Sequence, residues 1–320
     1  MTASIDSPRG GDGTRLVDLA TEATAAEWLT LSTAAHWNQN EADWRAMLAL
    51  GRGWGVRCGE TLVASTLVLP YREDVAMGRV AEQAASGRFA WISMVLVLPE
   101  WRGRGFAQRL LRIAIDDLAA AGLKPVLDAT PAGRPVYSKL GFVEGWAFTR
   151  WRRRAASNAS DATVAAAPPV ATVRPLAATD WPGIAHLDPP AFGADRTALL
   201  RQLAERLPEA AWTVADSDHL RAFLLGRDGR TALQLGPLVA DDEATACALL
   251  DAAFPAVAAL AAQRGLDVIA DLHDGRATVA KWLRQQSFTA ERPFTRMVLG
   301  ADAPPGDAAR IMMPAGPELG

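Results

Sequence analysis

The sequence of 320 residues contains few of the residue types that often mark a site by themselves: two cysteines, two tyrosines and four histidines. Cys58 and Cys247 suggest neither a disulfide framework nor a zinc pattern, so we expect a reducing, cytoplasmic setting. Asp271, His273 and Asp274 lie close together in sequence, but their arrangement is more typical of a polar turn at a strand end. We therefore expect no metal.

Charge of one sign and long apolar runs are also lacking. The net charge of −3 creates no overall field that would attract nucleic acid or an anionic membrane. The first thirteen residues are polar and Gly-rich, unlike a signal peptide, and no uninterrupted apolar run approaches the roughly 18 residues of a membrane span. We expect no nucleic-acid partner and no membrane partner, in a protein that is a monomer or a homodimer.

The length and the 50% hydrophobic composition predict two domains, at roughly 150 residues for each. Residues 153–172 are rich in Ala, Ser and Pro without periodicity, which is typical of a linker. We therefore predict a first domain over residues 14–152 and a second over 173–300. A Pro/Gly-rich tail follows over 301–320.

The second domain has the sequence of a diverged repeat of the first. FTRW at 148–151 recurs as FTRM at 294–297, and VLDATPAGR from Val126 has a counterpart in VIADLHDGR from Val268. Matches in the same order along the chain indicate a duplication.

Residues 95–108 combine a strand end, a Gly-rich turn and a helix start. Residues 89–98 are apolar on both faces, as in a strand buried in the middle of a sheet, and the helix expected over 104–121 has one apolar stripe. Gly103 and Gly105 stand between them. Backbone N–H groups at such a helix start, together with Arg102 and Arg104, would bind phosphate oxygens.

The order of these elements resembles a known family. Arg102-x-x-Gly105-x-Ala107, preceded by Val97-x-Pro99, is similar to the acetyl-CoA signature of the GNAT superfamily of N-acyltransferases. PAGRPVYSKLGF at 131–142 also resembles the last helix of that family and the start of the following strand. The resemblance implies an α/β fold with a mixed sheet, the acyl-CoA N-acyltransferase fold, in two tandem copies.

The resemblance also implies where acetyl-CoA would bind. The pantetheine arm would pair with the backbone of Val95–Val97. In the family, the strand that holds this segment separates here from the next strand, which is residues 126–129 in this sequence. The pyrophosphate would lie on the turn, and Arg104, Arg109 and Arg112 are candidates for the 3′-phosphate, although the last two fit a solvated helix face equally well. The implied cofactor-binding residues are Val95, Leu96, Val97, Arg102, Gly103, Arg104, Gly105, Phe106, Ala107 and Gln108.

Tyr137 falls at the position of the general acid of the family, which protonates the departing thiolate of coenzyme A. A backbone N–H near Val95 or Leu96 would polarise the thioester carbonyl. Many relatives have a Glu on the strand that corresponds to residues 89–97, and this sequence has no carboxylate there. Ser93 with an ordered water, or His36, are the candidates for the general base.

The acceptor side is less well defined by sequence. His36 and Trp37 lie in the segment that usually forms the acceptor site of the family, and Trp91 shares a strand face with Ser93. The tryptophans could equally form an apolar pocket or ordinary core.

The repeat equivalent of the phosphate turn, residues 235–244, has no Arg-Gly-x-Gly and carries three acids. The second copy is therefore expected to be degenerate and to bind no coenzyme A.

The active-plus-degenerate order, with FGADR at 192–196 and GPELG at 316–320, resembles the YitH-like tandem subgroup. The function implied is an acetyl-CoA-dependent N-acetyltransferase that acts on a small-molecule amine by direct attack in a ternary complex. Acetylation of a protein or peptide N-terminus, and a coenzyme A-binding sensor without catalysis, are the alternatives. The second domain could form a wall of the acceptor pocket or hold the tail against it.

Overall fold

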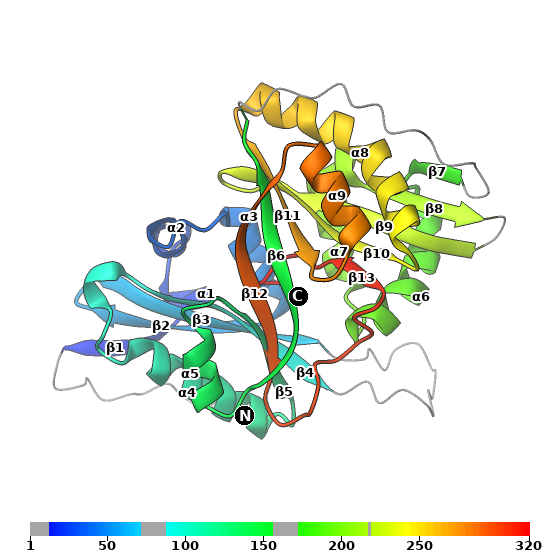
Figure 1. The fold of residues 1–320 in the computed structure, drawn as a ribbon. Helices are drawn as coiled ribbons and strands as arrows, with labels where there is room; N and C mark the ends of the chain where they lie inside the picture. The colour runs from blue at the N-terminus through cyan, green and yellow to red at the C-terminus, as the bar shows by residue number, and fades with distance from the viewer. Residues whose placement is uncertain (1–12, 72–87, 156–171, 217–218) are drawn as a thin grey trace.

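The computed structural model describes residues 13–71, 88–155, 172–216 and 219–320, and these residues form one mixed sheet of thirteen strands. Its two halves lie side by side in Figure 1, one for each sequence repeat, with two long strands crossing between them. The fold is thus the mixed α/β architecture in two copies that the sequence predicts.

The first half has the element order of the first repeat. Strands β2 and β3 form a hairpin around Gly59, whose φ of 55° favours glycine. Helix α4 covers the sheet with an apolar face that contains Leu110, Leu111 and Leu118. The elements are β1 (Thr14–Asp18), α1 (Leu19–Glu22), α2 (Ala25–Ala34), α3 (Glu41–Leu50), β2 (Arg52–Cys58), β3 (Thr61–Tyr71), β4 (Phe89–Val97), α4 (Phe106–Ala120), β5 (Lys124–Ala129), α5 (Arg134–Lys139) and β6 (Val143–Arg153).

The second half repeats this order and adds a short final strand. Its elements are β7 (Thr172–Pro175), α6 (Trp181–Phe192), α7 (Thr197–Arg206), β8 (Trp212–Asp216), β9 (His219–Arg227), β10 (Ala232–Ala240), α8 (Glu243–Arg264), β11 (Asp267–His273), α9 (Ala277–Gln285), β12 (Thr289–Val298) and β13 (Ile311–Met313). Helix α8 has the length and hydropathy of a membrane span, but Leu249, Leu250 and Val257 are buried against its own half, as in a core helix.

The two halves exchange strands β6 and β12. Along the sheet the order is β5-β12-β6-β11, so β12 pairs with β5 of the first half and β6 pairs with β11 of the second. The repeat-equivalent residues Phe148 and Phe294 lie directly opposite each other, with ring centroids 5.1 Å apart and an interplanar angle of 13°. The predicted domain ranges 14–152 and 173–300 are continuous in sequence. In the structure, each half of the sheet is completed by a strand from the other range.

Buried ion pairs hold each exchanged strand at its new partner. Arg296 of β12 makes two bonds of 3.0 Å to the carboxylate of Asp128 on β5. Its repeat equivalent Arg150 on β6 bonds both oxygens of Asp271 on β11, at 2.8 and 2.7 Å. All four side chains are almost completely buried. A buried guanidinium or carboxylate needs its partner, so strand exchange and ion pairing depend on each other.

We expect Arg296→Ala to destabilise the protein by about 3–5 kcal/mol, because it leaves the carboxylate of Asp128 buried without a partner. The control is Arg45→Ala, which breaks an exposed pair with Glu41 on one helix and should cost much less. Urea unfolding monitored by circular dichroism measures both. Similar losses in the two variants would show that the buried pair does not hold the exchanged strand.

Candidate active site

Strands β4 and β5 separate part of the way along their length. Their parallel pairing covers Phe89–Trp91 and Lys124–Val126 and then ends, although β4 continues to Val97 and β5 to Ala129. At this point β4 has a bulge, since Met94 and Val95 both lie between the partners of Ser65 and Leu67 on β3. The gap between the two strand ends is the feature that the family resemblance implied.

A cavity of about 630 Å³ opens in this gap. The predicted residues that line it are Trp37, Ser93, Val95, Leu96, Val97, Arg102, Ala107 and Tyr137. Sequence reasoning missed another group of polar and aromatic lining residues, which come from β5, from the exchanged strands, from the loop before α3 and from the tail. These are Gln39, Asp128, Arg150, Arg292, Phe294, Pro317 and Glu318.

The Gly-rich turn shapes the start of α4. Gly103 and Gly105 have φ angles of 75° and 81°, so their backbone conformation requires glycine, whereas a Cβ at either position would meet no atom within 4 Å. Gly105 is the N-cap, and no side chain caps the helix. The first N–H groups of α4 are therefore without helical or side-chain partners at a position that suits an anion.

The remaining residues of the turn surround this helix start without lining the cavity. Phe106 is buried and packs beside Trp101, while Gln108 and Arg112 are exposed and Arg109 is half-buried. The guanidinium of Arg104 lies 4.5 Å from the ring centroid of Trp101. Arg102, which does line the cavity, donates from Nε to the Val97 carbonyl at 3.3 Å.

Tyr137 lies on α5 at the cavity wall. Its ring packs edge-on against Phe142, and a Cβ at Gly133 would come within 2.8 Å of the ring. Its hydroxyl makes no hydrogen bond to any residue that the structure describes, so it is available to a ligand. Burial raises the pKa of Tyr137 to about 12. The phenol is therefore fully protonated near neutral pH.

The structure places the residues predicted for the acceptor side in three different surroundings. Trp37 and Ser93 line the cavity, and Ser93 is buried with its hydroxyl 3.9 Å from the sulfur of Met47. His36 is exposed and lies outside the lining. Trp91 is fully buried behind the wall, where its Nε1 donates to the Pro317 carbonyl at 2.9 Å. The structure thus brings Trp37 and Ser93 together, and it uses Trp91 to hold the tail.

The end of the tail is fixed against both halves. Tyr71 donates from its hydroxyl to the Leu319 carbonyl at 2.8 Å, and Arg196 donates to the Gly320 carbonyl at 2.5 Å. Arg196 is itself held by two bonds of 3.0 Å to buried Asp188. The segments FGADR and GPELG, noted in the sequence, are therefore in direct contact, and this contact presents Pro317 and Glu318 to the cavity.

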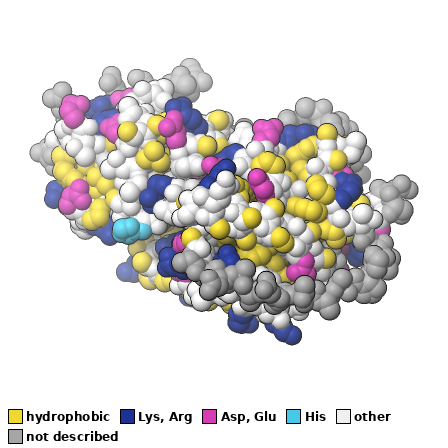
Figure 2. Space-filling view, turned by 90° about the horizontal axis from the view of Figure 1, so that it is seen from above, with side chains coloured by type: hydrophobic (Ala, Val, Ile, Leu, Met, Phe, Trp, Pro, Cys, Tyr) yellow, Lys and Arg dark blue, Asp and Glu magenta, His cyan; other side chains and the backbone are white. Residues whose placement is uncertain are grey.

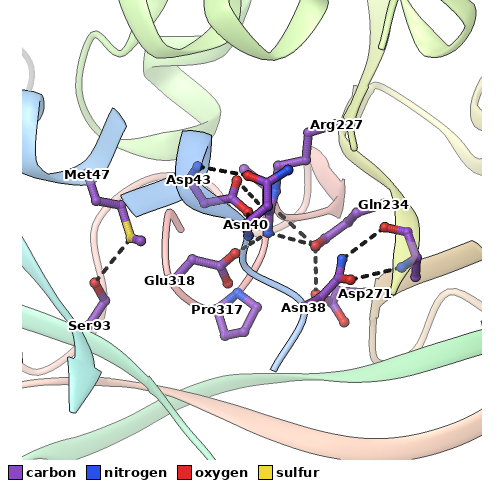
Figure 3. A network of polar contacts seen from close by, with 12 residues as sticks. Asn38, Asn40, Asp43, Met47, Ser93, Arg227, Gln234, Asp271, Pro317 and Glu318 are labelled. Carbon is purple, nitrogen blue, oxygen red and sulfur yellow. Dashed lines mark hydrogen bonds and ion pairs between the residues drawn. The ribbon is translucent and has the colours of Figure 1, made fainter. Parts of the chain in front are cut away.

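Glu318 belongs to a buried polar network between the halves, shown in Figure 3. One of its carboxylate oxygens pairs with Arg227, which also pairs with Asp43 at 2.6 Å and donates to Gln234 at 2.8 Å. Gln234 in turn donates to Asp271 at 3.1 Å. The other oxygen, Oε2, is buried without a hydrogen-bond partner in the described structure. Glu318 thus provides a buried carboxylate at the cavity that β4 lacks.

Asp128 is the other buried carboxylate of the cavity lining, and both its oxygens are occupied by Arg296. Burial raises its pKa to about 6, and the charge of Arg296 acts in the opposite direction. We assign Asp128 to the ion pair that holds β12, because it has no oxygen free of that pair.

The equivalent gap in the second copy is filled by the chain itself. Strand β10 pairs with β11 over Ala232–Leu235, and beyond that it pairs with β13, which also contacts β11. The filling is tight, since a Cβ at Gly236 would lie 2.4 Å from the Pro314 carbonyl oxygen. This supports the prediction that the second copy binds no coenzyme A.

The start of α8 is occupied as well. Asp242 accepts from the Thr245 N–H at 2.7 Å, and Glu243 accepts from two N–H groups at the start of α9.

Of the metal candidates, Asp271 is held by Arg150, and His273 Nδ1 lies 2.6 Å from the Asp274 carbonyl oxygen. No group that could hold a metal ion occurs among the residues that the structure describes.

Comparisons with known proteins identify the family of the chain. Two family models, each described as an acetyltransferase (GNAT) domain, match residues 17–145 and 184–312. Together they span most of the chain, which belongs to the GNAT acetyltransferase family as two tandem domains. A search of curated proteins gives no match.

Several solved structures share the tandem fold. A proposed acetyltransferase from Pyrococcus horikoshii matches with a TM-score of 0.71 and 17% identity, covering 98% of each chain. A tandem GNAT protein from the clavulanic acid biosynthesis pathway matches with a TM-score of 0.62 and 15% identity, over 92% of this chain and 100% of that one. A GCN5-related N-acetyltransferase from Sphaerobacter thermophilus matches with a TM-score of 0.54 and 13% identity, over 91% and 97%.

We expect Gly105→Asp to weaken acetyl-CoA binding by more than about tenfold, or at least about 1.4 kcal/mol, because it adds a carboxylate and strains the backbone at the α4 start. Gly122→Asp is the matched control, since Gly122 follows the other end of α4 with a φ of 64° and equally open surroundings. Titration calorimetry measures both. Equal affinities in the two variants would mean that the phosphates bind elsewhere.

Proposed function

We propose that the protein is an acetyl-CoA-dependent N-acetyltransferase that acts on a small-molecule amine by direct transfer in a ternary complex. The observation that carries this proposal is that one cavity of about 630 Å³ lies in the open strand gap and is lined by both Tyr137 and Glu318. Acetyl-CoA, when bound, supplies an activated acetyl thioester. Arg102 and the uncapped start of α4 would bind its phosphates, and the free edge of β4 at Val95–Val97 would hold the pantetheine arm.

Tyr137 would act as the general acid. Its hydroxyl has no partner in the described structure, and its pKa of about 12 keeps the proton in place until the thiolate of coenzyme A forms. A backbone N–H near Val95 or Leu96, at the β4 bulge, would polarise the thioester carbonyl.

Glu318 is the carboxylate best placed to receive the amine proton. The tail holds it in the cavity wall, and Oε2 has no hydrogen-bond partner, whereas His36 is exposed outside the cavity lining. Ser93 stays a candidate for ordering a water on the path of the proton. The amine must lose a proton before it attacks, so a carboxylate at this position would favour the reactive, neutral form.

The two alternatives are less favoured. A protein or peptide N-terminus needs an open groove, and here Pro317, Glu318 and the exchanged strands contribute walls to the acceptor side. A sensor without catalysis would not require an unpartnered phenol and an unpartnered carboxylate oxygen in residues that line one cavity. Basic and acidic side chains are interspersed on the face seen in Figure 2, and the proposal includes no nucleic-acid partner. A cytoplasmic location and a monomeric or homodimeric state are part of the proposal.

We expect Tyr137→Phe to lower kcat by at least about 100-fold while acetyl-CoA affinity stays unchanged, because the ring and its packing remain and only the proton donor is lost. Release of free thiol with a panel of amines measures kcat, and calorimetry measures binding. If the wild-type protein binds acetyl-CoA but releases no thiol with any amine, the sensor function is correct instead.

We expect Glu318→Gln to lower kcat by about 100-fold near neutral pH, with partial recovery at higher pH, because solvent then deprotonates the amine. Glutamine keeps the length and an oxygen for Arg227. Glu291→Gln is the control, since Glu291 pairs with Arg152 and does not line the cavity. A loss of the same size at every pH would assign Glu318 to holding the tail.

A further inference from the structure

Three residues of the cavity lining each have a buried polar atom without a hydrogen-bond partner in the described structure: Nε of Arg292, Oε2 of Glu318 and Oε1 of Gln39. Buried polar atoms in proteins are nearly always paired, so unpaired atoms of this kind at one cavity indicate a missing ligand. From them we propose that the acceptor is a small amine that also carries a carboxylate. Arg292 would bind the carboxylate, and Glu318 and Gln39 would accept from the amine. The inference rests on the proposed function.

Arg292 stands apart from the other arginines of the cavity. Arg150 is bound to Asp271 by both oxygens, whereas Arg292 has no carboxylate within ion-pair distance among the described residues. Neighbouring Glu291 is engaged by Arg152. The side chain of Arg292 is half-buried beside Phe294, with 4.9 Å between its guanidinium carbon and the ring centroid. A ring face replaces only a small part of the lost hydration, so the cation needs an anion.

The charges around Arg292 favour an anion with one negative charge. Arg150 and Arg152 repel its guanidinium, and Asp271 and Glu291 attract it, but these two carboxylates already pair with other arginines. Among these five side chains, the unbalanced charge is that of Arg292 itself. A carboxylate matches it in charge and accepts two parallel N–H bonds from a guanidinium.

Arg292 and Glu318 are held in fixed relative positions. Arg292 lies opposite Arg150 in the β12–β6 ladder, and Arg150 leads through Asp271, Gln234 and Arg227 to Glu318. From Arg150 onward, every link is an ion pair or hydrogen bond between buried side chains, whereas Arg292 is placed by its strand pairing. A cation and a firmly held carboxylate at one cavity suit a compact molecule that carries both an anion and an amine.

The phosphates of acetyl-CoA are a poor explanation for Arg292. They would lie at the start of α4, which follows the end of β4, whereas Arg292 is on β12, two strands away in the order β4-β5-β12. Adjacent strands are about 4.8 Å apart, so the two positions differ by roughly 10 Å across the sheet.

Matched acceptors test the proposal. With saturating acetyl-CoA, thiol release is measured for butylamine, 4-aminobutyrate, 1,4-diaminobutane and 3-aminopropylphosphonate. For the wild-type protein we expect kcat/KM for 4-aminobutyrate to exceed that for butylamine by about tenfold or more, because a charge-assisted pair with Arg292 forms only with the carboxylate. Arg292→Gln should remove this preference by raising KM for 4-aminobutyrate. Arg292→Glu should shift the preference to 1,4-diaminobutane.

Arg154→Gln is the control, because Arg154 is exposed, pairs with Asp267 and does not line the cavity. It should keep the wild-type preference. If butylamine or the diamine is the better wild-type acceptor, or if Arg292→Gln keeps the carboxylate preference, the inference is wrong and the proposed function stands. A preference for the phosphonate overturns the choice of carboxylate. If the protein releases no thiol with any amine, the proposed function fails and this inference fails with it.

Discussion

The reciprocal ion pairs Arg150–Asp271 and Arg296–Asp128 are the interaction on which the rest of the structure depends. Each one joins a strand of one half to a strand of the other, between side chains that are almost completely buried. Breaking either pair would leave a charge buried alone, which costs far more than the pair itself contributes over an apolar alternative. The pairs therefore hold each exchanged strand in register on its neighbour. The duplicated sequence builds one continuous sheet in place of two separate ones.

The strand exchange also shapes the cavity. Arg150, Arg292 and Phe294 lie on β6 and β12, so the exchange places them beside the gap between β4 and β5. The tail follows β12 and returns to the same gap, where Trp91, Tyr71 and Arg196 hold its backbone. The first repeat supplies the surface proposed for coenzyme A, and strand β12 and the tail add Arg292 and Glu318 to the charged groups that line the cavity.

The sequence predicted the local elements of the site, but it predicted neither the exchange of strands nor the roles of Glu318 and Arg292. The strand, turn and helix over 95–108 follow from patterns within a short segment, the position of Tyr137 follows from the family resemblance, and the structure places Tyr137 and the strand end at one cavity. The exchange of β6 and β12 has no local signature, because these strands bury the same residues whether they pair within their own repeat or across it. Arg150 and Arg296 were visible only as matching letters of the repeat.

Glu318 and Arg292 were missed for a related reason. Each becomes part of a site through contacts with residues far away in the chain. Arg292 belongs to no motif, and Glu318 lies in the GPELG segment, to which the sequence assigned no catalytic role. The absence of a carboxylate on β4 was the one signal in the sequence, since it meant that a base had to come from another segment.

The second copy shows why duplication and loss of the cofactor site fit together. Strand β13 occupies the space between β10 and β11 that corresponds to the open gap of the first copy, and acids occupy the helix start beside it. Filling that gap anchors the chain just before Pro317 and Glu318. If the second copy kept an open gap for coenzyme A, this part of the tail would lose its pairing with β10, and Glu318 would lose the support that fixes it in the cavity wall. One copy has therefore become the anchor for a segment that completes the site of the other.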